Sequence, residues 1–110
     1  MTFETAREIA LRLPGVEEAT SYGTPAFRVG KKLLARLHQD GESLVVRADF
    51  DARETLVRAN PKSFFVTDHY RAYPWVLVRL AAISRKDLAA VLDEAWRQCA
   101  PRKRSSRRAD

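Results

Sequence analysis

The stretch that decides the fold is "YGTPAFRVGKKLLARLHQDGESLVVRA", which runs from Tyr22 to Ala48. It holds three short runs rich in apolar residues, separated by Gly30-Lys31 and Asp40-Gly41. Glycine tolerates the positive φ that tight turns need, and Asp-Gly is a strong hairpin signal. Strands joined by short turns run antiparallel. The stretch therefore predicts a meander made of "YGTPAFRVG", "LLARLH" and "SLVVRA".

Helices are predicted on both sides of this meander. Thr2 to Leu13 carries apolar residues at helical spacing and ends at Pro14-Gly15. After the meander, Asp51 to Ala59 begins with a capping-box arrangement in which Asp51 precedes Glu54 by three residues. The last helix is capped by Ser84 and ended by Pro101. Its apolar stripe consists of Leu88, Val91, Leu92, Ala95, Trp96 and Cys99.

A second hairpin is predicted between the last two helices. The apolar runs "SFFVT" and "WVLVRLAAI" read as strands, joined by a loop at residues 68–74. Each helix has one apolar face, so the helices should cover one side of the sheet. The sequence thus predicts an α+β fold, an antiparallel sheet with β-hairpin wings, in the order α-β-β-β-α-β-β-α.

Strict alternation along the strands assigns residues to the two faces of the sheet. It places Leu33 on the core face and Leu34 and Arg36 on the open face. The arginines and aromatic residues of an open face can contact phosphates and stack on bases. The alternative is a solvated face on which arginine stems cover apolar surface. The polar and aromatic residues assigned to this open face are Arg28, Arg36, His38, Arg47, Trp75 and Arg79.

The loop in "VTDHYRAYPWVLVRL", residues 66–80, concentrates residues that could perform chemistry. Asp68 and His69 are adjacent, but neighbours on an extended segment point to opposite sides, so we do not expect an acid–base pair. We interpret the loop as a corner in which Tyr70 and Tyr73 pack against the sheet and Arg71 projects outward.

No motif for a metal, cofactor or enzyme stands out. The metal-binding candidates His38, His69 and Cys99 lie far apart in sequence, and there is no Cys-x-x-Cys or His-x-x-x-His. There is no G-x-S-x-G, and the scattered glycines form no phosphate-binding loop. We therefore expect no metal, no cofactor and no enzymatic activity.

Composition indicates one domain with a basic tail. The chain has 110 residues, 45% of them hydrophobic, and no apolar run long enough to span a membrane. A lone cysteine and no secretory signal favour a reducing, cytoplasmic setting. Residues 1–100 form the predicted domain, and 101–110 a disordered tail with five of the 20 basic residues. The net charge of +6 favours an acidic partner, although such a tail can also serve only solubility.

Two segments resemble a known family. "LPGVEE" at residues 13–18 and "YGTPAFRVGKK" at residues 22–32 are similar to the opening of MmcQ/YjbR-like proteins. The aromatic-basic hairpin and the capped final helix extend the resemblance over about residues 3–100. The chain departs from the family at Ala72, Tyr73 and Pro74, where many members carry a basic residue and a histidine before the tryptophan.

The resemblance implies a double-wing fold similar to frataxin-like (CyaY-like) domains, with two β-hairpin wings proposed to contact DNA. The frataxin likeness also raises iron binding, which relies on an acidic ridge. The first helix mixes Glu4 and Glu8 with Arg7 and Arg12, so we expect no iron site.

The sequence thus predicts a non-enzymatic domain that binds DNA weakly, mainly through phosphates. The alternative partner is another protein, which would make this an interaction or regulatory domain without a nucleic-acid role. The predicted nucleic-acid contacts are Arg28, Lys31, Lys32, Arg36, Arg47, Tyr70, Arg71, Arg79, Arg102, Lys103 and Arg104.

Overall fold

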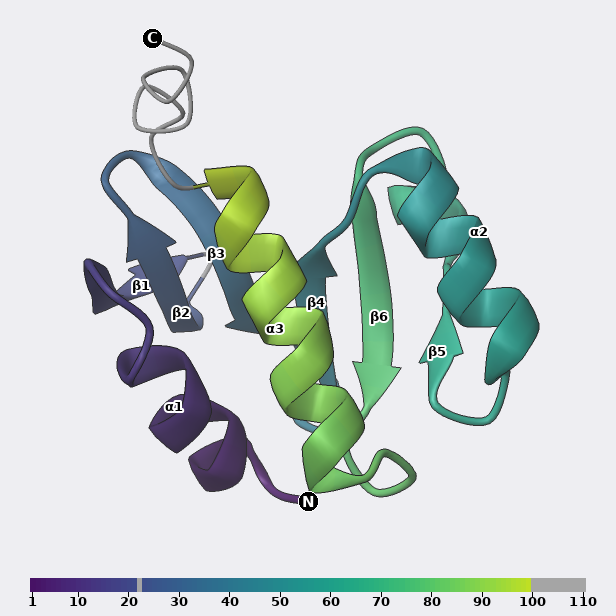
Figure 1. Cartoon of the computed structure of the whole chain (residues 1–110), viewed down its shortest axis with the longest axis horizontal. Coiled ribbons are helices and arrows are strands. Elements are labelled where there is room, and N and C mark those ends of the chain that lie inside the picture. Colours follow the sequence, from purple (N-terminus) through teal and green to yellow (C-terminus); the bar gives the residue numbers. More distant parts are fainter. Residues whose placement is uncertain (22, 100–110) are drawn as a thin grey trace, which may run out of the picture.

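The computed structural model describes residues 1–21 and 23–99 and combines helices with one six-stranded sheet (Figure 1). None of the helices in these ranges is long and apolar enough to cross a membrane. In chain order the elements are α1 (Phe3–Leu11), β1 (Val16–Ser21), β2 (Thr24–Val29), β3 (Lys32–Leu37), β4 (Ser43–Arg47), α2 (Phe50–Ala59), β5 (Phe64–Phe65), the short 3-10 helix η1 (Asp68–Tyr70), β6 (Trp75–Arg79) and α3 (Arg85–Cys99).

The sheet has the strand order β1-β2-β3-β4-β6-β5, and every neighbouring pair is antiparallel. This confirms the predicted α+β class, the meander and the second hairpin. One additional strand, β1, was not predicted. Its sequence "VEEATS" has few apolar residues because it is an edge strand, and its pairing runs from Val16 opposite Val29 to Ser21 opposite Thr24.

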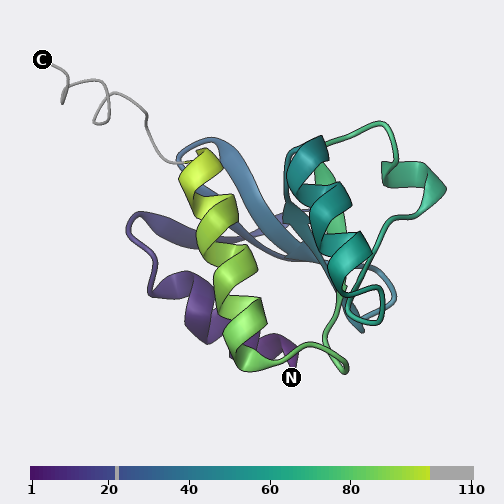
Figure 2. The same ribbon diagram turned by 45° about the vertical axis from the view of Figure 1, so that its right-hand side comes forward.

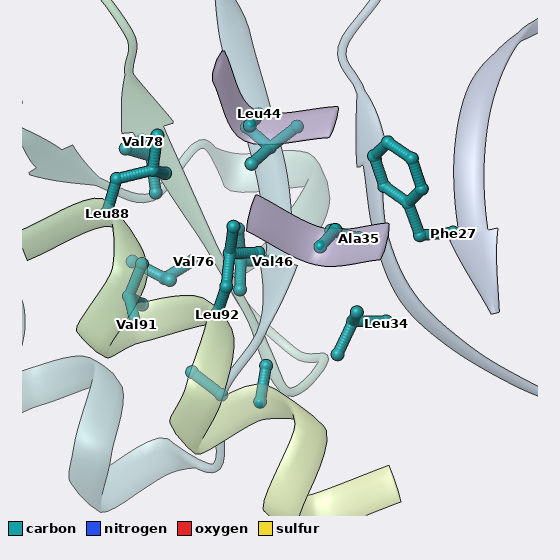
Figure 3. Close-up of a cluster of buried hydrophobic side chains, with 14 of the residues drawn as sticks. Phe27, Leu34, Ala35, Leu44, Val46, Val76, Val78, Leu88, Val91 and Leu92 are labelled. Carbon is teal, nitrogen blue, oxygen red and sulfur yellow. The ribbon is translucent and has the colours of Figure 1, made fainter. Parts of the chain in front are cut away.

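All three helices cover the same face of the sheet, as predicted (Figures 1 and 2). The core lies between α1, α3 and the sheet. In Figure 3, Val76 and Val78 of β6 lie against Leu88 and Val91 of α3. Leu56 and Val57 of α2 pack against the same core from the side of β5 and β6. One continuous core therefore joins all three helices to the sheet.

The helix caps agree with the predictions at α3 but not at α2. Ser84 Oγ accepts a hydrogen bond from the Asp87 amide at 3.1 Å. In α2 the cap is Asp49, whose carboxylate accepts from the Ala52 amide at 2.8 Å, so the prediction of Asp51 as the cap was wrong. The helix starts at Phe50, which places Asp51 in its first turn instead.

A β-bulge in β3 corrects the predicted faces of this strand. The pairing with β2 shifts between Phe27 and Arg28, so that Leu34 has no partner opposite it. Leu34 consequently turns into the core beside Ala35 (Figure 3). Leu33 lies on the opposite face, where it lines a hollow with Arg36 and Tyr70. Beyond the bulge the alternation holds, and Arg36 lies on the face away from the helices, as predicted.

That second face is not simply open to water. The chain between β5 and β6 folds back across it and buries Tyr70 against Val45 and Leu77. Phe65, Val66 and Trp75 pack around this small second core. The predicted open face is therefore covered by this loop where Tyr70 packs on β4 and β6.

Candidate nucleic-acid interface

The covering loop is held in place by Arg53 of α2. Its Nη1 donates to the carbonyl oxygens of Tyr70, Tyr73 and Trp75 at 3.2, 2.8 and 3.3 Å. Its Nη2 donates to the carbonyl of Arg71 at 2.9 Å. Residue patterns gave no sign of this role, because all of these partners are backbone carbonyls, which every residue carries. Arg53 therefore fixes the path of the loop.

Tyr70 is the anchor of the loop on the sheet. Its side chain is buried, and its hydroxyl accepts a hydrogen bond from Arg36 Nη2. Nη1 of Arg36 donates to the Leu37 carbonyl at 3.2 Å and to Thr24 Oγ1 at 3.4 Å. With only 5% of its surface exposed, Arg36 is not the surface phosphate contact that was predicted. Its guanidinium supports the loop from below.

The loop and the sheet enclose a hollow of about 770 Å³. This volume falls in the range of typical ligand sites, roughly 300–1,000 Å³. No carboxylate of the described residues lines it, whereas a guanidinium, two imidazoles and three larger aromatic rings do. The hollow therefore suits a planar or anionic group. Its lining residues are Leu33, Arg36, His38, Gln39, Val45, His69, Tyr70, Tyr73 and Trp75.

The two histidines of the hollow contact Tyr70 edge-on. The ring centroid of His69 lies 4.7 Å from that of Tyr70, and that of His38 lies 6.1 Å away. Asp68 pairs with Arg71 at 3.0 Å, and no hydrogen bond or ion pair joins Asp68 to His69. The side chain of Arg71 is exposed, as predicted. The loop thus presents rings and a surface ion pair.

Tyr73 departs from its predicted position. It was expected to pack against the sheet like Tyr70, but 55% of its surface is exposed at the rim of the hollow. Its backbone is fixed at both ends, since its amide donates to the Tyr70 carbonyl at 3.0 Å and its own carbonyl accepts from Arg53. An exposed ring on an ordered backbone is the result.

Arg47 and Arg79 stabilise opposite ends of β6. The guanidinium of Arg47 lies 4.8 Å from the centroid of the Trp75 ring, and its Nε donates to the Leu33 carbonyl at 2.9 Å. Arg79 lies over the Phe65 ring at 4.2 Å and donates to the carbonyls of residues 61 and 62. The predicted arginines of this face are therefore spread along the sheet and do not form one patch.

A second group of predicted contacts does come together, at the turn between β2 and β3. Gly30, with φ of +63°, allows the turn, and Arg28 closes it by donating to the Lys31 carbonyl at 3.4 Å. Lys31 and Lys32 are exposed, and neither forms an ion pair with a carboxylate of residues 1–21 and 23–99. We call Arg28, Lys31 and Lys32 the basic end.

The end of α3 meets this basic end. Cys99 Sγ lies 3.7 Å from the carbonyl oxygen of Leu33, the residue after Lys32. Burial raises the pKa of the Cys99 thiol, although Arg47 and Lys32 act in the opposite direction, so Cys99 is a buried apolar residue as predicted. Arg102, Lys103 and Arg104 lie outside the described residues, and the chain leads into them from this point.

A separate groove of about 480 Å³ lies between α2 and α3 on the helical face. Its floor is apolar, with Leu56, Phe64 and Val91. Carboxylates from both helices stand at its rim, and its one lining cation is Arg47. The acidic lining residues are Asp51, Asp87 and Glu94.

Comparison with known proteins identifies the family. The YjbR family model matches residues 11–98. Uncharacterised proteins of Mycobacterium tuberculosis and Mycobacterium bovis are 34% identical to this chain over 94 residues, covering 69% of this chain and 73% of each relative. The crystal structure of Deinococcus radiodurans protein DR2400, with a DUF419 domain, matches with a TM-score of 0.71 and 25% identity, covering 86% of this chain and 75% of that one. The chain is a member of the YjbR family.

Proposed function

We propose that this domain is non-enzymatic and binds DNA weakly, mainly through phosphates. The observation that carries the proposal is the basic end, where two exposed lysines that form no ion pair within the described part of the chain stand beside Arg28. Free ammonium groups of this kind attract phosphates without reading sequence, because each contact releases a condensed counterion. The basic residues that follow α3 in the sequence add to the positive charge of the chain.

The predicted contacts divide into two roles in this proposal. The basic end and residues 102–104 supply the phosphate attraction, with Arg71 as an outlying contact. Arg36, Arg47 and Arg79 are committed to carbonyls and rings. Arg36 and Arg79 support the sheet face on which Tyr70 is anchored, whereas Arg47 also lines the groove between α2 and α3. The proposal of no catalysis is supported by the loop, in which Asp68 is paired with Arg71 and the His69 ring lies edge-on to the Tyr70 ring.

The test is the salt dependence of binding. Fluorescence anisotropy would measure the affinity for a labelled 20-base-pair duplex between 50 and 200 mM salt. Replacing Lys31 and Lys32 by Ala should weaken binding and reduce the slope of log K against log salt by about 1.8, since each phosphate contact contributes about 0.9.

The matched control replaces Lys62 and Lys86 by Ala, because both are exposed lysines outside the basic end and form no ion pair within the described residues. This control should change binding far less. Equal losses in the two double variants would contradict the proposed interface, and no binding at 50 mM salt would contradict the function.

The groove between α2 and α3 favours a second candidate, recognition of a basic peptide segment. Its apolar floor and acidic rim complement a peptide with apolar and basic residues. Replacing Leu56 by Glu would place a negative charge on the apolar floor of the groove. If that change, and not the Lys31 and Lys32 double change, abolished binding to a cellular partner, the interaction role would be the correct one.

A further inference from the structure

We propose that the hollow beneath the covering loop takes one unpaired base of a single-stranded nucleic acid, whose phosphates run towards the basic end. The inference rests on the proposed function and adds to it the form of nucleic acid that binds. It follows from three observations: an exposed ring at the rim, a lining without carboxylates among the described residues, and the short distance between the hollow and Arg28 of the basic end.

The first observation is the exposed ring of Tyr73, on which a base could stack. Tyr73 exposes 55% of its surface, more than any other large hydrophobic residue of the described chain, and it lines the hollow together with Trp75. Bases stack on such rings whatever their identity, because every base has a π-face. The backbone of Tyr73 is fixed by Arg53, so little conformational freedom is lost on binding. A base that remains paired inside a duplex cannot reach the ring.

The second observation is the electrostatic character of the hollow. The buried Arg36 lines it, and the rings of His38 and His69 each lie edge-on to the Tyr70 ring. No carboxylate of residues 1–21 and 23–99 lines it. Gln39 adds an amide that can both donate to and accept from the edge of a base. The lining of the hollow therefore favours a planar group whose edges form hydrogen bonds and which is carried by an anionic chain.

The third observation is continuity with the basic end. Leu33 lines the hollow and pairs with Arg28 of the basic end, so these two side chains lie on the same face of the sheet. One strand residue advances about 3.3 Å, so Arg28 and the turn that carries Lys31 stand within one or two nucleotides of the mouth, whereas Lys32 pairs with the core residue Val29 and lies on the opposite face. A groove that combines backbone-tracking cations with stacking rings is the usual arrangement of single-strand binding. The hollow, Arg28 and Lys31 thus form one path.

The experiment compares labelled (dT)12 with a 12-base-pair duplex by anisotropy at 50 mM salt. The wild type should bind the single strand about tenfold more tightly than the duplex, a ratio that matches the stacking of one base. Tyr73→Leu should abolish this preference while leaving duplex binding intact. Tyr73→Phe, which retains the ring, should keep it.

Leu11→Ala is the control, because Leu11 is an exposed large hydrophobic residue at 38% that lies on α1, outside the hollow, whereas the comparably exposed Phe50 contacts Arg53. It should leave the preference unchanged. Thymidine monophosphate at the same concentration as (dT)12 should not displace the oligonucleotide from the protein. If thymidine monophosphate and (dT)12 bound with equal affinity, the ligand of the hollow would be a free nucleotide and not a single strand.

The outcomes separate this inference from the proposed function. Equal binding of single strand and duplex, still dependent on Lys31 and Lys32, would refute the hollow and leave the phosphate interface standing. Loss of the preference in Leu11→Ala as well as in Tyr73→Leu would also refute it, because the effect would not be specific to the hollow. No binding of either DNA would refute the function itself.

Discussion

Replacing Arg53 by Met should destabilise the loop that builds the hollow. The half-buried guanidinium contacts four carbonyls, but Nη1 has only two hydrogens for three of them. About two or three effective hydrogen bonds are therefore lost. Each bond to a charged donor contributes about 1.5–3 kcal/mol when buried, and the freed carbonyls of the exposed loop regain water. We expect a loss of about 2 kcal/mol in the free energy of unfolding.

Arg58→Met provides the matched control on the same helix. Arg58 pairs with Glu54 at 2.7 Å, and both side chains are largely exposed. Exposed pairs of this spacing contribute about 0.3–0.5 kcal/mol. Urea denaturation followed by circular dichroism would compare the two variants, and hydrogen exchange would report on the amides of residues 70–75. If Arg53→Met costs no more than Arg58→Met, or if those amides exchange as slowly as in the wild type, Arg53 does not hold the loop.

Three further predictions follow from the structure. Tyr70→Phe should cost about 1–2 kcal/mol in urea denaturation, because Arg36 loses a buried hydroxyl acceptor, whereas Tyr73→Phe should cost under about 0.5; equal costs would count against the anchoring role. Although burial opposes it, hydrogen bonds from Glu42 and Ser43 lower the pKa of Asp40, so Asp40 stabilises the fold above about pH 4 and loses this effect as the pH falls through its folded pKa. Asp40→Asn should flatten this acid-side loss of stability, and an unchanged pH profile would contradict the assignment. Deleting residues 101–110 should leave the melting temperature nearly unchanged but weaken DNA binding and its salt dependence; a large fall in melting temperature would show that the tail packs on the domain.

The sequence was sufficient for the parts of the fold that depend on local patterns. The apolar stripe of α3, its cap at Ser84 and the turn at Gly30 each follow from residue type and spacing. Strand β1 was not predicted from the sequence, because its pairing with β2, and not its own composition, makes it a strand. The bulge at Leu34 was not predicted for a related reason, since an inserted residue is defined by the register of two strands.

The candidate site was predicted only in part. Lys31 and Lys32 are exposed where the turn signal placed them, but alternation could not show that Arg36 is buried beneath Tyr70. That burial depends on how the loop folds back over the sheet. The loop in turn depends on contacts between Arg53 and backbone carbonyls, which no residue pattern reveals.

The most direct test of the account is an NMR titration of the 15N-labelled protein with (dT)12 at 50 mM salt. The account predicts that backbone amide shifts change at residues 28–33 and 69–75, which form the basic end and the rim of the hollow. It also predicts that these changes diminish at 200 mM salt, as phosphate-directed binding requires. Changes confined to residues 51–60 and 87–94, which line the groove between α2 and α3, or no changes at 50 mM salt, would contradict it.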